Sequence, residues 1–187
     1  GLSAPLARQG ALFTLSSPNE RPEAKGAVYS VRCLGGFEVR ARGGPIERWP
    51  LEKSRELLAL LVAQRGASVA REVVAEALWP DYEWDAALKH TLSNVVTTLR
   101  STLRTALDDE ALQPLFAARQ RFQLPTALFE SDLDELEAAI RRAPSLPDAA
   151  ALAEYERALA LYAGDFLEGE FFAWLDSYRL EYRQLLI

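Results

Sequence analysis

The chain has 187 residues, of which 49% are apolar and 26% are charged, and this composition is typical of a globular protein with a sizeable core. The sequence has no run of about 18 apolar residues and no charged leader before an apolar segment, so we expect a cytoplasmic protein without a membrane partner. Cys33 is the only cysteine and His90 the only histidine. These counts exclude an intramolecular disulfide and argue against a metal site, a cofactor or a histidine-dependent enzyme, and we expect none of these.

The net charge of −6 is divided unevenly along the chain. Residues 26–125 contain 13 Lys and Arg against 12 Asp and Glu, whereas residues 126–187 contain 5 against 13. Because an acidic surface is repelled by nucleic acid, this division predicts two domains with different partners. We expect one domain over 27–125 and another over 126–187, and we expect the proline-containing residues 1–26 to be a flexible tail.

The first predicted elements are short strands and two helices. Apolar and polar residues alternate from Ala27 onward, with glycine pairs as breaks, which predicts a small antiparallel meander with Cys33 in the core. Clustered leucines then predict a helix between 51 and 65 that ends at Gly66. Ser68 is expected to cap a second helix, which runs as far as Trp79-Pro80.

The stretch from Ala86 to Leu107 is predicted to be a long helix with two different faces. Its apolar face is formed by Leu88, Leu92, Val95, Val96, Leu99 and Leu103. Its polar face is formed by Lys89, His90, Ser93, Asn94, Thr97, Arg100, Ser101 and Arg104, without one carboxylate among them. Such a face suits a DNA groove, since Lys and Arg replace counterions and Asn, Ser and Thr bond to bases or phosphates. The alternative is the solvated face of a core helix.

A hairpin is predicted after this helix, with strands at 115–117 and 121–124 and a tip at 118–120. Strands, three helices and a hairpin, in this order, are the arrangement of a winged helix-turn-helix. In that fold the third helix enters the major groove, and the hairpin, or wing, reaches the neighbouring minor groove. Arg119 and Arg121 in the predicted wing therefore favour DNA binding independently of the helix.

Beyond Pro125 the pattern is entirely helical. Asp132 is expected to cap a first helix, with Glu135 at the capping-box position. A second helix is predicted over 148–162 and a last one over 170–187. The apolar face of the second helix is formed by Leu152, Tyr155, Leu159 and Tyr162. Paired antiparallel helices of this kind resemble tetratricopeptide units. The expected fold is an α+β N-terminal winged helix-turn-helix followed by an all-α tetratricopeptide-like helical domain.

Motifs in both halves of the chain follow one another in a distinctive order. The first half contains Leu57-Leu58-Ala59-Leu60-Leu61, Val69-Ala70-Arg71-Glu72, Ala77-Leu78-Trp79-Pro80, Thr98-Leu99-Arg100 and Arg121-Phe122-Gln123-Leu124-Pro125. The second half contains Tyr162-Ala163-Gly164-Asp165-Phe166-Leu167 and the predicted helix from Trp174 to Arg183. With these motifs, residues 28–187 resemble the antibiotic regulatory protein family, in which an OmpR-type winged helix is followed by a bacterial transcriptional activator domain.

The resemblance implies a transcriptional regulator without catalytic activity, which binds double-stranded promoter DNA, usually at direct repeats, and recruits RNA polymerase. It places His90, Ser93, Asn94, Thr97, Thr98 and Arg100 on the groove-facing surface of the third helix and Arg121 in the wing. The loop of Asp81, Tyr82, Glu83 and Trp84 falls where related regulators contact polymerase, or else it is a Trp-anchored connection. Lys53 and Arg71, near helix starts, are candidate phosphate contacts or solvated charges.

Two features depart from the family. Thr98 stands where relatives often carry Arg, and Ser93 is short and neutral, so fewer long basic side chains are available to read bases. The activator domain normally continues through more helices, so we expect a fragment of a longer regulator whose last helix pairs with a second copy or a neighbouring domain. The near-neutral charge of residues 26–125 keeps a second function open, namely a protein-interaction module whose winged helix no longer binds DNA.

Overall fold

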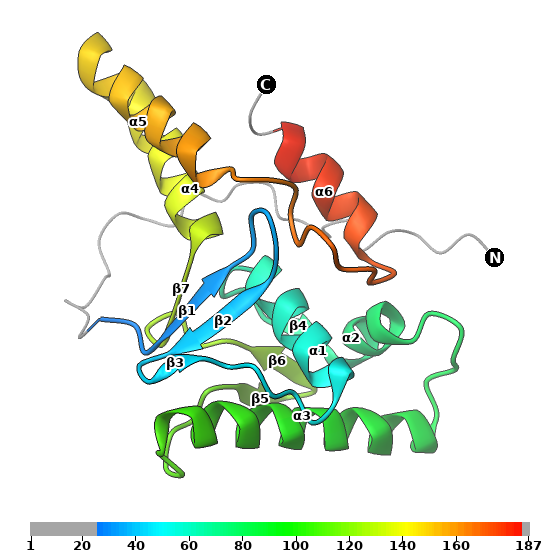
Figure 1. The fold of residues 1–187 in the computed structure, drawn as a ribbon. Helices are drawn as coiled ribbons and strands as arrows, with labels where there is room; N and C mark the ends of the chain where they lie inside the picture. Colours follow the sequence, from blue (N-terminus) through cyan, green and yellow to red (C-terminus); the bar gives the residue numbers. More distant parts are fainter. Residues whose placement is uncertain (1–25, 185–187) are drawn as a thin grey trace.

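A computed structural model describes residues 26–184, and the predicted tail lies outside them except for Gly26 (Figure 1). The predicted meander is confirmed for β1 (Tyr29–Arg32) and β2 (Glu38–Ala41), which pair antiparallel. Its third strand, expected over 46–49 after a break at the second glycine pair, is wrong: β3 (Gly44–Pro45) lies at that expected break and pairs with β2. A fourth strand, β7 (Phe129–Ser131), pairs in parallel with β1. The expectation of an entirely helical pattern beyond Pro125 is therefore wrong, because the three residues of β7 lie beyond this proline and complete the first sheet.

Three helices follow the meander. They are α1 (Glu52–Ala63), α2 (Arg71–Leu78) and α3 (Ala86–Leu107). The bounds of α3 and its apolar face are confirmed, since all six predicted apolar side chains are buried. Asp85 caps its first turn by accepting a hydrogen bond of 2.8 Å from the Leu88 N–H. In Figure 1, α3 runs along one side of the molecule, and α1 packs between it and the rest of the chain.

The predicted wing forms a hairpin of β5 (Phe116–Ala118) and β6 (Arg121–Gln123). A third strand, β4 (Val69–Ala70), pairs antiparallel with β6 and immediately precedes α2. The prediction that Ser68 caps α2 is wrong. Residues 69 and 70 are extended to pair with β6, so the N-cap position is Ala70, which has no side-chain hydrogen bond. Long-range strand pairing thus takes precedence over the local capping preference of serine.

The remaining helices are α4 (Asp132–Arg142), the 3₁₀ turn η1 (Ala143–Ser145), α5 (Asp148–Leu161) and α6 (Leu175–Gln184). Ser131, not Asp132, caps α4 by accepting a hydrogen bond from the Asp134 N–H. The carboxylate of Asp132 instead accepts hydrogen bonds of 2.8–2.9 Å from the backbone N–H groups of Cys33 and Leu34. The last helix begins at residue 175, not 170 as predicted.

The segment before α6 is bound to the connection between β1 and β2. The Gly35 N–H donates to the Asp165 carbonyl at 3.0 Å, and the Leu167 N–H donates to the Cys33 carbonyl at 2.7 Å. Phe166 also forms bridges with residues 34 and 36 and is completely buried. Residues 165–167 are therefore fixed against the connection between β1 and β2, and the Glu170 carbonyl accepts a hydrogen bond of 2.9 Å from Nη2 of Arg179.

The two halves of the chain share one hydrophobic core, to which the sheets, α1, α3, α4 and α6 contribute. The predicted apolar face of α5 is different, because Leu152, Tyr155 and Leu159 are 58%, 43% and 62% exposed. The α4–α5 pair projects away from α3 in Figure 1. None of the helices in residues 26–184 is long and apolar enough to cross a membrane.

Candidate nucleic-acid interface

The most outward part of α3 is a line of four exposed polar side chains. It is formed by His90, Asn94, Thr97 and Ser101 and is called the α3 stripe below. The spacing of four, three and four residues keeps these side chains on one face of a helix with 3.6 residues per turn. This face lies opposite the buried apolar stripe. Within residues 26–184, none of the four has a carboxylate as an ion-pair or hydrogen-bond partner.

Hydroxyl groups on α3 are already engaged with the helix itself. The Thr97 hydroxyl donates to the Ser93 carbonyl at 3.0 Å, and the Ser93 hydroxyl donates to the Lys89 carbonyl at 2.9 Å. The Thr97 hydroxyl therefore keeps only acceptor capacity toward an external ligand, and the Ser93 hydroxyl already accepts a hydrogen bond of 3.0 Å from Nη2 of Arg71. Asn94, whose amide can donate and accept, is the group on the stripe best suited to base edges.

Two predicted DNA-binding arginines are held by the connection between α3 and the wing. Arg100 donates through Nε and Nη2 to the Leu115 carbonyl at 3.3 and 3.0 Å. Arg104 donates through Nε to the Leu112 carbonyl at 2.7 Å. Burial, and then the neighbouring Arg104, lowers the pKa of Arg100. Both arginine side chains lie at the flank of α3 and stabilise the loop that leads into β5. Thr98, another predicted contact on α3, is half-buried.

Lys53 is also engaged within the protein. Its ammonium donates to Glu56 at 2.7 Å and to the Leu78 carbonyl at 2.6 Å, and it lies 5.6 Å from the centre of the Trp79 ring. These contacts join the start of α1 to the end of α2. The structure thus uses Lys53 to hold two helices together and leaves no extended ammonium for a phosphate.

The acidic loop between α2 and α3 is exposed. Asp81, Tyr82 and Glu83 reach solvent, and Tyr82 is 69% exposed. Trp84 is half-buried, and the ammonium of Lys89 lies 5.4 Å from the centre of its ring. This contact places Lys89 at the loop, to one side of the α3 stripe.

The turn of the wing presents an arginine in an uncommon backbone conformation. Arg119 and Gln120 have φ angles of 50° and 61°, as a two-residue hairpin turn of type I′ requires. Glycine or asparagine usually occupies such positions, since other residues pay about 1 kcal/mol for a left-handed backbone. Arg119 is exposed, and it has no ion pair or hydrogen bond of its side chain within residues 26–184. Its guanidinium is therefore the freely available cation of the turn.

Arg121 is exposed but is held against β4. Its Nε donates to the Ser68 hydroxyl at 2.8 Å, and its Nη2 donates to the Ser68 carbonyl at 2.7 Å. The next residue, Phe122, is buried beneath the wing. Neither the contact of Ser68 with Arg121 nor the buried position of Phe122 was predicted from the sequence. The alternation of β6 identifies the inward side of Phe122, whereas nothing local indicates the partner of Ser68.

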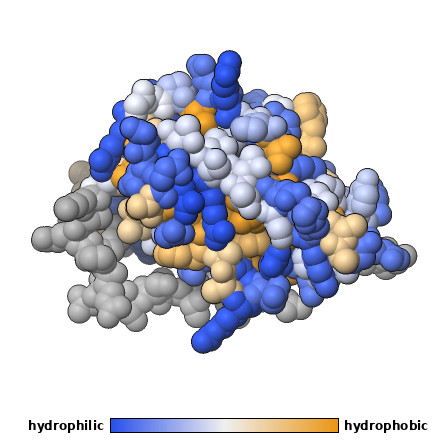
Figure 2. Space-filling view, turned by 90° about the horizontal axis from the view of Figure 1, so that it is seen from below, coloured by the Kyte–Doolittle hydropathy of each residue, from blue (hydrophilic) through white to orange (hydrophobic). Residues whose placement is uncertain are grey.

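Figure 2 shows the molecule from the side on which α3 lies. Hydrophilic and weakly polar residues occupy the middle of this face, and the apolar residues among them are scattered. Lys53, Arg100 and Arg104 keep their positive charge, but each is half-buried and hydrogen-bonded to a carbonyl of the protein.

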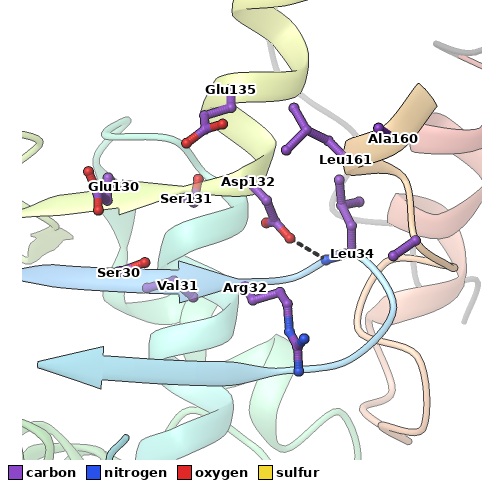
Figure 3. A pocket seen from close by; sticks show the side chains of 11 residues that line it. Ser30, Val31, Arg32, Leu34, Glu130, Ser131, Asp132, Glu135, Ala160 and Leu161 are labelled. Carbon is purple, nitrogen blue, oxygen red and sulfur yellow. Dashed lines mark hydrogen bonds between the residues drawn. The ribbon is translucent and has the colours of Figure 1, made fainter. Parts of the chain in front are cut away.

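A pocket of about 330 Å³ lies away from α3, between β1, the start of α4 and the end of α5 (Figure 3). Burial raises the pKa of Asp132 at this pocket, although the N–H groups of Leu34 and Cys33 oppose the shift. Glu135 lies 3.6 Å from Arg157. Across residues 26–184, we find no group of three or more His, Cys, Asp or Glu side chains that could hold a metal ion.

A solved structure of Mycobacterium tuberculosis EmbR in complex with a low affinity phosphopeptide is similar to this chain, with a TM-score of 0.69 and 22% identity. The similarity covers 85% of this chain and 42% of the EmbR chain, so this chain spans less than half the length of EmbR. No protein-family model matches the chain, and no curated protein matches it. The similarity supports the general fold, a small α+β unit followed by helices.

Proposed function

We propose that the protein is a sequence-specific, double-stranded DNA-binding regulator of transcription, and that α3 enters the major groove. The observation that carries this proposal is the α3 stripe, an exposed line of hydrogen-bonding side chains without a carboxylate. An α-helix fits the major groove, and an Asn side chain can bond in two places to adenine. The fold and the resemblance to antibiotic regulatory proteins support the same function.

The wing supplies the second contact of the proposal. Arg119 extends from a two-residue turn, where its guanidinium is free to enter a minor groove. Strained backbone conformations occur most often at functional sites, and the left-handed backbone of Arg119 fits a role of its side chain in binding. Arg121 is held by Ser68 and would instead lie beside the DNA backbone next to the wing.

The experiment measures binding to duplexes selected from a random-sequence library, over a series of salt concentrations. Arg119→Gly removes one charge, while glycine keeps the turn. The negative slope of the log of the association constant against log salt should therefore become shallower by about one unit. Arg141→Ala, in an exposed position on α4, is the control and should leave the slope unchanged. Failure to select any sequence, or binding indifferent to salt, would contradict the proposal.

We further propose that the exposed acidic loop contacts RNA polymerase and makes the protein an activator. Asp81 and Glu83 are exposed on it, at one end of α3. The double substitution Asp81→Asn and Glu83→Gln should abolish activation in a reconstituted transcription assay without weakening DNA binding. Loss of DNA binding, or retained activation, would contradict this role.

A protein-docking module is the second candidate. It is favoured by the internal use of Lys53, Arg100 and Arg104, which leaves few free cations beside α3. The salt series separates the two functions, because only binding to a polyanion releases condensed counterions.

A further inference from the structure

On the basis of the proposed DNA-binding function, we infer that Arg71 is a positioning residue that fixes the wing against α3, and not a contact to phosphate. Arg71 is the first residue of α2 and lies between the two elements assigned to the two grooves. Its role would be to set the distance between the α3 stripe and Arg119.

Three contacts of Arg71 reach three different places. Its backbone N–H donates to the Gln120 carbonyl in the wing turn at 2.9 Å. Its guanidinium carbon lies 5.5 Å from the centre of the Phe122 ring on β6. Its Nη2 donates to the Ser93 hydroxyl on α3 at 3.0 Å. The backbone of Arg71 therefore connects α2 to the wing turn, and its side chain connects α2 to β6 and to the flank of α3.

The burial of one guanidinium nitrogen, Nε, distinguishes this arrangement from a phosphate contact. The Nε atom of Arg71 is buried and has no hydrogen-bond partner within residues 26–184. A buried donor without a partner destabilises the folded protein. An arginine extended into solvent toward a phosphate would keep all its donors hydrated and would avoid this cost. The guanidinium recovers part of that cost through its cation–π contact with the Phe122 ring, 5.5 Å from the ring centre.

The Ser93 hydroxyl is fixed from both sides. It donates to the Lys89 carbonyl and accepts from Arg71, so its orientation on α3 is determined. Ser93 is therefore the attachment point of the wing on α3 and does not read a base. Base reading remains with the α3 stripe, one step around the helix from Ser93.

The consequence for binding is preorganisation. The wing and α3 must meet two grooves at once, and a wing that tilts freely would have to be ordered when DNA binds. Losing the connection through Arg71 should weaken the DNA contacts of the wing and of α3 together. It should not remove a protein cation that contacts a DNA phosphate.

The test compares Arg71→Ala, Arg71→Lys and Ser93→Ala in the full chain, with the duplex selected for the unaltered protein. A positioning role predicts that Ala and Lys weaken binding by a similar factor, about tenfold, with the salt slope unchanged. Ser93→Ala should weaken binding in the same direction, and its effect should largely disappear when Arg71 is already Ala. Arg119→Gly is the matched control, since it should lower the slope.

A phosphate contact predicts the opposite result. Arg71→Lys would then restore most of the affinity, and Arg71→Ala would lower the slope by about one unit. Either finding would overturn the inference.

Amide hydrogen exchange of the free protein tests the connection without DNA. In Arg71→Ala, the amides of β4, β5 and β6 should exchange faster, while those of Leu58 to Leu61 in α1 stay protected and report an intact fold. Unchanged exchange in the wing would overturn the inference. If the unaltered protein selects no DNA sequence, the proposed function fails, and the exchange result still decides whether Arg71 holds the wing.

Discussion

Arg55 on α1 and Glu170 in the segment before α6 form a two-point ion pair, with Nη1–Oε2 and Nη2–Oε1 distances of 2.8 and 2.6 Å. The side chains are only 19% and 18% exposed, and Arg55 also lies 4.8 Å from the centre of the Phe37 ring. This pair joins the helix at the centre of the winged unit to the C-terminal segment. The two halves are therefore coupled by charge as well as by their shared core.

Glu170→Gln is expected to lower the free energy of unfolding by about 1–3 kcal/mol, because it leaves the partly buried Arg55 without its counter-charge. Denaturant unfolding measures the change. Glu135→Gln is the control, since the Glu135–Arg157 pair is 3.6 Å long and about half-exposed, and it should change stability by less than about 0.5 kcal/mol. Equal effects of the two substitutions on the free energy of unfolding would show that the Arg55–Glu170 pair stabilises the protein no more than an exposed ion pair does.

Arg100→Ala is expected to reduce stability by about 1–2 kcal/mol, because the Leu115 carbonyl loses its donor at the entrance to the wing. The same variant should leave the salt slope of DNA binding unchanged. Thermal unfolding and the salt series together check both parts. A fall in slope by about one unit, with stability retained, would identify Arg100 as a phosphate contact instead.

Asn94→Ala is expected to weaken binding to the preferred duplex by about 1–3 kcal/mol while leaving binding to unrelated duplexes nearly unchanged. The reason is that a lost amide removes base recognition but no charge. Competition binding with preferred and scrambled duplexes measures this ratio. Gln184→Ala removes an amide from an exposed position on α6 and should alter neither value. An unchanged ratio in Asn94→Ala would remove Asn94 from the reading surface.

Glu56→Gln should make stability less sensitive to pH. Burial raises the pKa of Glu56 above its ordinary value, although the hydrogen bond and charge of Lys53 oppose the shift. The folded state therefore holds this proton at pH values where the unfolded state has lost it, and wild-type stability falls as pH rises between the two pKa values. Glu56→Gln lacks this titration, so its stability relative to wild type should rise as pH rises across that interval. Parallel curves for the two proteins would contradict the shifted pKa.

The sequence by itself determined the elements whose signal is local. The apolar residues of α3 recur every three or four positions, so its bounds and its buried face could be predicted from one stretch of chain. The two stretches at 115–117 and 121–124, with a tip between them, likewise predicted the wing hairpin. The polar character of the α3 stripe also follows from the sequence, because its four residues are polar and are spaced opposite the apolar face.

Only the tertiary structure decided which polar groups on this surface are free. Arg100 and Arg119 are both arginines near the wing, yet one is bound to the Leu115 carbonyl and the other is not bound within residues 26–184. Strands β4 and β7 were also missed, because a two- or three-residue strand exists only through its partner. Hydrogen bonds between distant residues depend on how the chain closes on itself, and local periodicity carries no information about them.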